Sequence, residues 1–208
     1  MQLFYAKTLN PRKACAVARY LELPVEFVSV DLGAGQHRTA DFRALNPNAK
    51  VPVLLDGDKV LWESNAIMCY LSDKAGADLW PHDERQIEVL RWLCWDATEF
   101  APQAGTLYFE RLIKPFFIGA EPDAAEIDKA ERGFHRYARI LEGHLKGRRW
   151  LVADRLSVAD FAVAIVLPYA AEARLPLEAY PEVRRWHAQL EALDAWRQPF
   201  PADAVAPH

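Results

Sequence analysis

The sequence has few cysteines. Its 208 residues include only Cys15, Cys69 and Cys94, which form no Cys-x-x-Cys pair and no spacing typical of metal ligands. This pattern excludes a thiol–disulfide enzyme that relies on its own cysteine pair. An odd, sparse cysteine count is typical of a reducing compartment, so we expect a cytoplasmic protein. We expect all three thiols to lie on apolar helix faces and to belong to the core.

The sequence also lacks a strong excess of charge and long apolar segments. It has 25 Lys+Arg and 29 Asp+Glu, a net charge of −4, so we expect no general attraction to nucleic acid or anionic lipid. Its apolar runs are short and interrupted by charges, which excludes a membrane-spanning helix. Residues 1–10 lack the pattern of a signal peptide. Apolar residues are abundant and make up 51% of the sequence. This share is enough for a self-standing core without disulfides.

Residues 3–72 alternate between strand and helix patterns. Alternating or short apolar runs predict strands over 3–6, 25–30, 51–55 and 59–62. Helical spacing predicts helices over 12–23, 41–45 and 63–72. Asp56-Gly57-Asp58 separates the last two strands and is a strong hairpin signal. The predicted order is therefore β-α-β-α-β-β-α.

From about residue 83 only helix patterns occur. They predict helices over 87–103, 124–145 and 183–193. Ser157 and Asp160 form a capping box, which predicts a further buried helix that Pro168 kinks or ends. The Pro- and Ala-rich segment 198–208 is expected to be loose. We predict one domain over 1–77, a linker over 78–86 and an all-helical domain over 87–208.

Four segments, in this order, resemble the cytosolic glutathione transferase family. They are LNPNAKVPVL (45–54), WESNAIMCYL (62–71), LWPHDE (79–84) and LVADRLSVADF (151–161). The resemblance extends over essentially the whole chain. It implies an α/β, thioredoxin-like N-terminal domain, an all-α C-terminal domain and a homodimer. It also implies a cytoplasmic detoxification enzyme with glutathione as co-substrate and no metal.

Val51 and Pro52 form the first part of the expected glutathione site. An X-Pro bond adopts the cis form at a cost of only about 0.5–1 kcal/mol. A cis bond here would stop the strand and leave the backbone groups of Val51 unpaired, and an extended tripeptide can pair with such an edge. A trans proline that starts the strand is the alternative. Ala49 stands where relatives often have glycine, a small change if its φ is negative.

Glu63 and Ser64 lie where the predicted strand becomes a helix. The Ser64 hydroxyl and the free N–H groups of the helix start form a natural carboxylate receptor. Glu63 supplies the opposite charge for an α-amino group, so the pair could hold the γ-glutamyl end of glutathione. Plain N-capping by Ser64, with Glu63 as a partner of the helix dipole, is the alternative and is compatible with binding.

The glycine carboxylate of glutathione requires a cation. The resemblance makes His37 and Arg38 in a charged loop, and Lys50 just before Val51, the candidates. The alternative for each of them is an ordinary solvated surface charge.

The glutathione thiol requires a hydrogen-bond donor. A thiol with a pKa near ~8.5 is only a few per cent ionised at neutral pH, and lowering that pKa by two units takes ~2.7 kcal/mol. One donor to a charged acceptor supplies ~1.5–3 kcal/mol. A helix N-terminus adds ~0.3–1 kcal/mol. One well-aimed donor is therefore sufficient.

Asn10 falls at the position of this donor when counted from the first strand. Many relatives place Tyr, Ser or Cys in this loop, but residues 6–14 contain none of them. Thr8 and Asn10 resemble the Thr-x-Asn loop of bacterial nu-class transferases, which are associated with glutathione-dependent disulfide reduction. We expect the Asn10 amide or the Thr8 hydroxyl to donate. The alternative is that Asn10 caps the helix with Pro11 at its first position; Tyr5 as donor and Cys15 as nucleophile are weaker hypotheses.

The second substrate is expected on the helical side, which is rich in aromatic residues. Trp92 and Trp95 follow helical spacing and are expected in the core. Pro115 predicts a helix break near the cleft. The pocket candidates beside that break are Tyr108, Phe116 and Phe117.

These residues favour an enzyme that activates the glutathione thiol for attack on an electrophile, or for reduction of a peroxide or disulfide. The expected partners are glutathione and a small electrophilic or disulfide substrate, with no nucleic acid and no membrane. The alternative is a non-catalytic binding or regulatory protein on the same scaffold, although such relatives tend to lose the Glu-Ser pair. A glutathione-dependent isomerase is a weaker alternative, because its Ser-Ser-Cys-like loop is missing.

Overall fold

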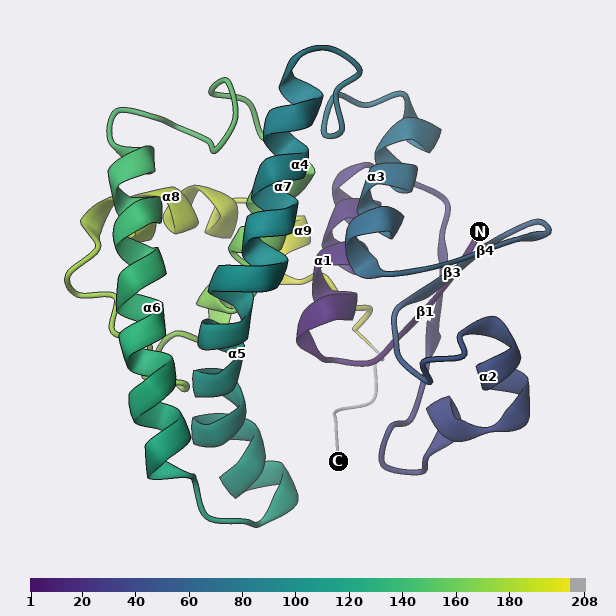
Figure 1. Cartoon of the computed structure of the whole chain (residues 1–208). Coiled ribbons are helices and arrows are strands. Elements are labelled where there is room, and N and C mark those ends of the chain that lie inside the picture. Colours follow the sequence, from purple (N-terminus) through teal and green to yellow (C-terminus); the bar gives the residue numbers. More distant parts are fainter. Residues whose placement is uncertain (203–208) are drawn as a thin grey trace. The chain divides into compact units, whose positions relative to one another are not determined.

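The computed structural model describes residues 1–202. The chain forms two compact units (Figure 1), one made of Met1–Trp80 with the C-terminal segment that begins at Ala192, the other of Pro81–Glu191. We call them the N-terminal unit and the helical unit. No helix in this part of the chain combines the length and the apolar character needed to cross a membrane.

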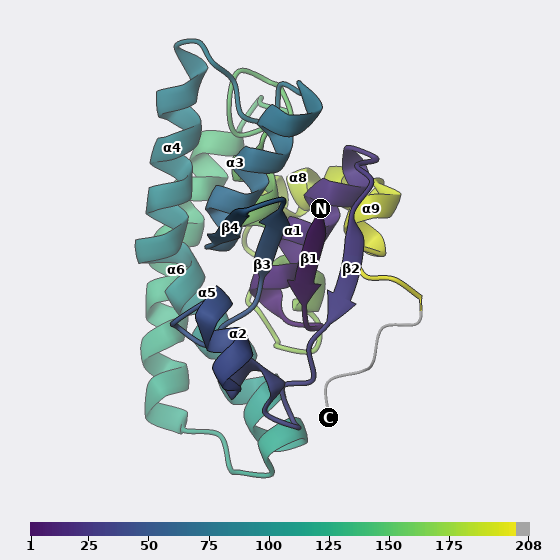
Figure 2. The ribbon, with the colours of Figure 1, turned by 90° about the vertical axis from the view of Figure 1, so that its right-hand side faces the viewer.

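The N-terminal unit contains a mixed four-stranded sheet with the order β2-β1-β3-β4 (Figure 2). Its strands are β1 (Gln2–Tyr5), β2 (Glu26–Ser29), β3 (Val53–Asp56) and β4 (Lys59–Trp62). Strand β1 is parallel to β2 and antiparallel to β3. Strands β3 and β4 form the predicted hairpin, in which Gly57 has a φ of 58° that glycine adopts without strain.

Three helices complete the predicted order: α1 (Leu9–Tyr20), α2 (Ala40–Leu45) and α3 (Ser64–Ala75). Helices α1 and α3 pack against each other. Val17 of α1 and Ile67 of α3 are fully buried. Helix α2 contributes Phe42 to a separate cluster with Val30 and Val53. The prediction of an alternating N-terminal half is therefore confirmed.

The C-terminal segment packs against α1, where the sequence predicts a loose tail. A short helix, α9 (Asp194–Arg197), which the sequence does not predict, contacts α1 and buries Trp196 completely. Arg12 of α1 donates to the carbonyl of Trp196 at 2.5 Å and lies over its ring. Phe200 stacks on Tyr5, with ring centroids 5.6 Å apart. The expectation of a loose tail is thus wrong for residues 198–202; residues 203–208 lie outside the described residues.

The helical unit is made of helices only. They are α4 (Arg85–Trp95), α5 (Ala101–Tyr108), α6 (Ala124–Leu145), α7 (Val158–Val163) and α8 (Pro181–Glu191), with π-helical segments Asp96–Phe100 and Phe109–Ile118 and a 3-10 turn Leu167–Tyr169. The bounds of α6 agree with the prediction. The predicted helix 87–103 is part of a longer helical run, which contains Pro115 and ends at Gly119, with a φ of 73°. The break predicted at Pro115 is therefore wrong, and α7 ends at Val163, before Pro168 is reached.

The capping box predicted at Ser157 and Asp160 is present and lies at the centre of the helical unit. Asp160 is fully buried, and its Oδ1 accepts from the Leu151 N–H at 3.0 Å and from the Trp186 Nε1–H at 2.9 Å. Its Oδ2 accepts from the N–H and the hydroxyl of Ser157 at 2.9 and 3.0 Å. Burial raises the pKa of this carboxyl to about 6, although these hydrogen bonds lower it.

Candidate functional site

The Val51–Pro52 peptide bond is cis, as predicted. Strand β3 begins only at Val53, which pairs with Phe4 of β1, so Val51 lies outside the ladder. The side chain of Val51 packs against the cluster around Phe42 of α2, and Pro52 is buried. The apolar cluster therefore holds this turn at the start of β3.

Asn46 supports the turn, a role that the sequence analysis does not predict. Its side chain is buried and donates to the carbonyl of Lys50 at 2.7 Å, while its Oδ1 accepts from the N–H of Asn48 at 3.0 Å. An Asn-Pro pair after a short helix is the signal that could have revealed it, since asparagine often bonds to nearby backbone in turns. Ala49 in this turn has a φ of 52°. The condition under which alanine in place of glycine would be a small change, a negative φ, is therefore not met at Ala49.

Ser64 begins helix α3, and Glu63 precedes it as the N-cap residue. The predicted capping by the Ser64 side chain is wrong, since its hydroxyl instead donates to Oδ1 of Asn10 at 3.4 Å. The first intrahelical bond runs from the N–H of Ile67 to the carbonyl of Glu63, which leaves the N–H groups before it unused by the helix. A carboxylate can bind to such groups.

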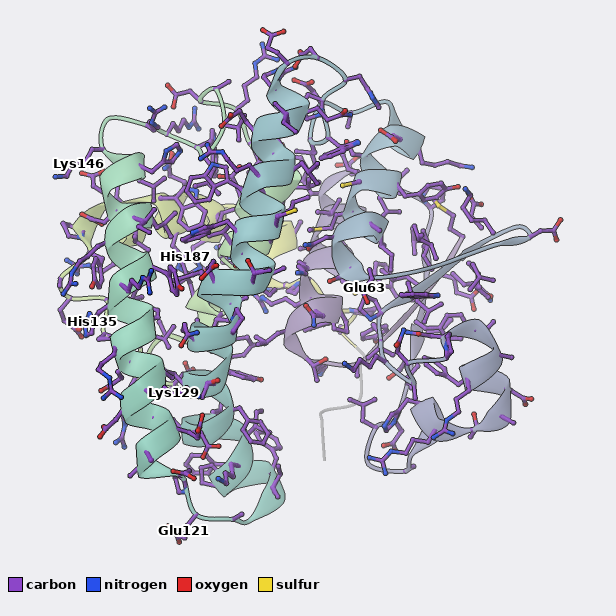
Figure 3. The ribbon with its side chains drawn as sticks, in the orientation of Figure 1. Glu63, Glu121, Lys129, His135, Lys146 and His187 are labelled. Atoms are coloured by element: carbon purple, nitrogen blue, oxygen red, sulfur yellow. The ribbon has the colours of Figure 1, made fainter. Side chains whose placement is uncertain are left out.

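Glu63 adopts an uncommon backbone conformation, with φ 73° and ψ 111°. Such a conformation costs on the order of 1–3 kcal/mol and persists only where the surrounding structure enforces it. The side chain is exposed at the entry to α3 (Figure 3). Its carboxylate is therefore available to a cationic ligand group next to the helix start.

Asn10 is the second residue of α1, which begins at Leu9 with Thr8 as N-cap. The alternative in which Asn10 caps this helix is therefore wrong. Its Oδ1 faces the Ser64 hydroxyl, which directs the amide N–H groups of Asn10 elsewhere. The Thr8 side chain makes no capping hydrogen bond. The starts of α1 and α3 thus meet at Asn10 and Ser64, as the predicted site requires.

Neither Cys15 nor Cys69 supplies a reactive thiolate within this geometry. Cys15 is fully buried, and burial raises its pKa far above the usual range. Burial likewise raises the pKa of Cys69 to about 12. Cys94 is exposed, so the expectation that all three thiols are part of the core is wrong for Cys94. Tyr5 is buried in β1 beneath Phe200, so a thiol would not reach its hydroxyl easily.

His37 and Arg38 lie in a 3-10 turn, Gln36–Arg38, and interact with each other. Arg38 donates through Nε to Nε2 of His37 at 3.2 Å, which requires a neutral ring. Desolvation, and then the charges of Arg38 and Arg43, lower the pKa of His37. The structure thus favours a neutral His37, whereas Arg38 and Lys50 are exposed cations.

The aromatic candidates lie in the helical unit. Tyr108 is buried and packs edge to face on Tyr169, with centroids 5.1 Å apart. Phe116 and Phe117 are 75% and 44% exposed at the end of the π-helical segment. Trp92 is buried in the core as predicted, and half-buried Trp95 stacks on Phe100.

Comparisons with known proteins agree with this geometry. Residues 2–73 match the family model of the glutathione S-transferase N-terminal domain, and residues 100–194 match that of the C-terminal domain. Glutathione S-transferase 3 of Zea mays is 34% identical, over 98% of this chain and 95% of that relative. Disulfide-bond oxidoreductase YfcG of Escherichia coli is 29% identical, over 95% of this chain and 93% of that relative.

Solved structures show the same architecture. Glutathione transferase F7 from Populus trichocarpa superimposes with a TM-score of 0.88 at 25% identity, over 95% of this chain and 96% of that one. A glutathione S-transferase III in apo form superimposes with a TM-score of 0.85 at 32% identity, over 100% of this chain and 98% of that one. The cis-proline turn of this chain agrees with these comparisons. This chain belongs to the glutathione S-transferase family, as its two matched domains and its relatives show.

Proposed function

We propose that the protein is a glutathione transferase that binds glutathione in its N-terminal unit and activates the thiol for attack on an electrophile. The observation that carries this proposal is the contact between Asn10 and Ser64, which joins the start of α1 to the start of α3. The cis Val51–Pro52 turn belongs to the same unit. The relatives named above are transferases or a disulfide oxidoreductase.

Glutathione is an extended tripeptide with a different charge at each end. In our proposal, Ser64 and the free N–H groups of α3 bind the γ-glutamyl carboxylate, and Glu63 binds its α-amino group. The backbone of Val51 pairs with the cysteinyl residue. Arg38 and Lys50 bind the glycine carboxylate. His37 contributes a neutral side chain to that end, because its pKa is lowered.

The thiolate is stabilised by a side-chain donor at the start of α1. Asn10 donates through its amide group, and Thr8 is the second donor through its hydroxyl. Because Oδ1 of Asn10 is turned toward Ser64, the nitrogen of the same amide is available to the sulfur. One such bond to a charged sulfur supplies about 1.5–3 kcal/mol, which lowers the pKa of the thiol by roughly one to two units and so raises its ionised fraction at neutral pH well above a few per cent.

The second substrate lies against Tyr108, Phe116 and Phe117 of the helical unit. The exposed rings of Phe116 and Phe117 offer apolar surface without a distinctive polar group. We also propose a cytoplasmic homodimer with a role in detoxification and a bacterial nu-class-like loop at Thr8 and Asn10. Light scattering on the purified protein tests the dimer.

Glutathione-dependent disulfide reduction is the second candidate activity. The similarity to YfcG favours it, as does a site whose donors are Thr8 and Asn10 rather than a cysteine. In this reaction two glutathione thiols reduce one disulfide, and glutathione disulfide leaves together with two product thiols. Parallel assays with a chlorinated aromatic, a hydroperoxide and hydroxyethyl disulfide separate the two activities.

Two substitutions test the roles at the contact. Asn10→Ala removes one hydrogen bond to a charged sulfur. The activation free energy should therefore rise by about 2 kcal/mol and kcat should fall roughly 30-fold, with little change in the KM for glutathione. Ser64→Ala should instead weaken glutathione binding, measured by calorimetry. Ser29→Ala on exposed strand β2 is the matched control for the serine change and should leave both quantities unchanged. Equal, small effects of Asn10→Ala and Ser64→Ala would remove both assignments.

A further inference from the structure

A cavity lies entirely within the helical unit, and none of its lining residues belongs to the candidate glutathione site or to the proposed pocket of the second substrate. Its volume is about 390 Å³, and it is lined by His135, Arg139, Glu142 and Gly143 of α6, by Lys146 directly after this helix, and by Ala179 and Tyr180 just before α8. Pockets for small molecules commonly measure roughly 300–1,000 Å³. This cavity is therefore large enough for a small organic ligand.

The hollow exists because of the spacing of residues along α6. Of the four lining residues of α6, Arg139 lies four positions after His135, and Glu142 and Gly143 lie three and four positions after Arg139, which places them along one side of the helix. Gly143 lies between Arg139 and Lys146 in the chain, and a Cβ atom at this glycine would meet no atom within 4 Å. The missing side chain at Gly143 thus leaves open space between two long cationic side chains.

Tyr180 forms a fixed wall of this cavity. It is 3% exposed, and its hydroxyl lies 2.7 Å from Nδ1 of His135. The same hydroxyl donates to the carbonyl of His135 at 3.2 Å. The pKa of Tyr180 is raised, chiefly by burial, so its hydroxyl stays protonated at neutral pH. Tyr180 is therefore a rigid part of the cavity floor, although it exposes little of its own surface.

The charge of the cavity is positive. Arg139 and Lys146 are both exposed, and within residues 1–202 neither forms an ion pair. Glu142 is the acidic lining residue, and its two oxygens accept from the N–H groups of Glu182 and Val183 at 3.1 and 3.0 Å. Its charge is therefore directed to the start of α8, where a helix N-terminus stabilises it.

Acidic neighbours do not cancel this charge. The carboxylate of Glu182 is paired with Arg185 at 2.7 Å. Glu178 is exposed beside Ala179 but does not line the cavity. Lys146 and His135 extend from the same side of α6 in Figure 3. A guanidinium and an ammonium thus remain for a ligand that carries negative charge.

We propose that this cavity is a binding site for a small aromatic carboxylate, separate from the glutathione site. Arg139 pairs with the carboxylate through parallel N–H donors, a geometry to which guanidinium is suited. Lys146 adds a second charge from the other side of Gly143. The methyl group of the exposed Ala179 contacts the aromatic body, and the buried Tyr180 fixes the floor of the cavity beneath it.

Titration with 2-naphthoate, followed by the NMR shift of the Gly143 backbone amide, tests the site on the full-length protein. We expect saturable binding of 2-naphthoate and none of 2-naphthamide, its neutral counterpart. Saturating S-hexylglutathione should leave the binding unchanged, because the two sites are separate. Failure of 2-naphthoate to saturate, or equal binding of the neutral amide, would overturn the proposal.

Matched substitutions on α6 and at its C-cap residue Lys146 measure how much each side chain contributes to ligand binding. Arg139→Gln and Lys146→Gln should each raise the Kd about tenfold, since each removes a charge-assisted contact. Lys129→Gln makes the same change near the opposite end of α6 (Figure 3), where Lys129 does not line the cavity, and should shift the Kd less than twofold. An equal effect of all three would show that only the general charge of the helix matters and would contradict the site.

Filling the hollow is an independent check. Gly143→Leu places a side chain in the open space and should abolish binding, with the fold verified by circular dichroism. Gly143→Ala is the milder variant; it should weaken binding and raise Tm, because alanine favours a helix more than glycine does. Unchanged affinity in Gly143→Leu would refute the proposal.

Discussion

At Asp160, one buried carboxylate accepts hydrogen bonds from three separate places in the chain, at Leu151, Ser157 and Trp186. Its folded pKa of about 6 is above the ordinary value near ~3.9, with burial as the cause. Folding therefore favours the protonated form. The stabilising contribution of this form is complete below pH ~4 and is lost as the pH rises through about 6.

Asp160→Asn isolates this contribution, because asparagine does not titrate. The contributions of all other titrating groups cancel when the free energies of unfolding of the two proteins are subtracted. The free energy of unfolding of the original protein minus that of the variant should decrease between pH 4 and pH 7, by on the order of 3 kcal/mol. Urea denaturation at several pH values measures it. A difference that stays constant over this range would contradict the raised pKa.

Individual site residues were predictable where a local pattern specifies them. Counting from the first strand places Asn10 correctly beside the start of α1, and the Val-Pro pair predicts the cis bond. The alternative in which Asn10 caps α1 is wrong, because this helix begins one residue before Asn10. The sequence gives no sign that the pKa of His37 is lowered, since this depends first on desolvation in the folded chain and then on the nearby charges of Arg38 and Arg43.

At the scale of elements, strong periodicity and clear caps gave correct bounds. Helix α6 agrees with the prediction because Asp123 caps it, accepting from the N–H groups of Ala125 and Glu126. Pro115 was expected to break a helix, but the π-helical segment accommodates it. Helix α9 has only four residues, too few for a periodic pattern, so the sequence could not reveal it.

The packing of α9 on α1 predicts a specific stability effect. Trp196→Ala removes a fully buried indole ring and its contact with Arg12, so the free energy of unfolding should fall by about 3–5 kcal/mol. Trp62→Ala in β4 removes a ring that is 38% exposed and should cost clearly less. Chemical denaturation of both variants compares them. Equal losses would show that α9 adds little to the N-terminal unit.

On the scale of the whole molecule, the sequence predicted an alternating α/β part followed by a helical part, because each has its own local pattern. It did not predict that the chain returns to the first part at its end. The bond from Arg12 to Trp196 joins residues 184 positions apart, and no local pattern records such a pairing. The N-terminal unit is thus built from two distant pieces of the chain.

This division predicts a local effect of shortening the chain. A chain that ends at Glu191 lacks the contacts of Trp196 and Phe200, whereas one that ends at Ala202 retains them. Hydrogen exchange of the α1 amides should be faster in the shorter chain, while the amides of α6 should exchange at similar rates in both. Equal exchange in α1 would show that the C-terminal segment does not stabilise it.

The return of the C-terminal segment also affects the order of events during synthesis. The sheet and α1 leave the ribosome before the helical unit, yet α1 remains without its partner Trp196 until the helical unit has been translated. The helical unit, encoded between the two pieces, has all its residues available earlier. The first unit to be made is consequently the last to be completed, and a nascent chain stalled before Ala192 would carry it unfinished.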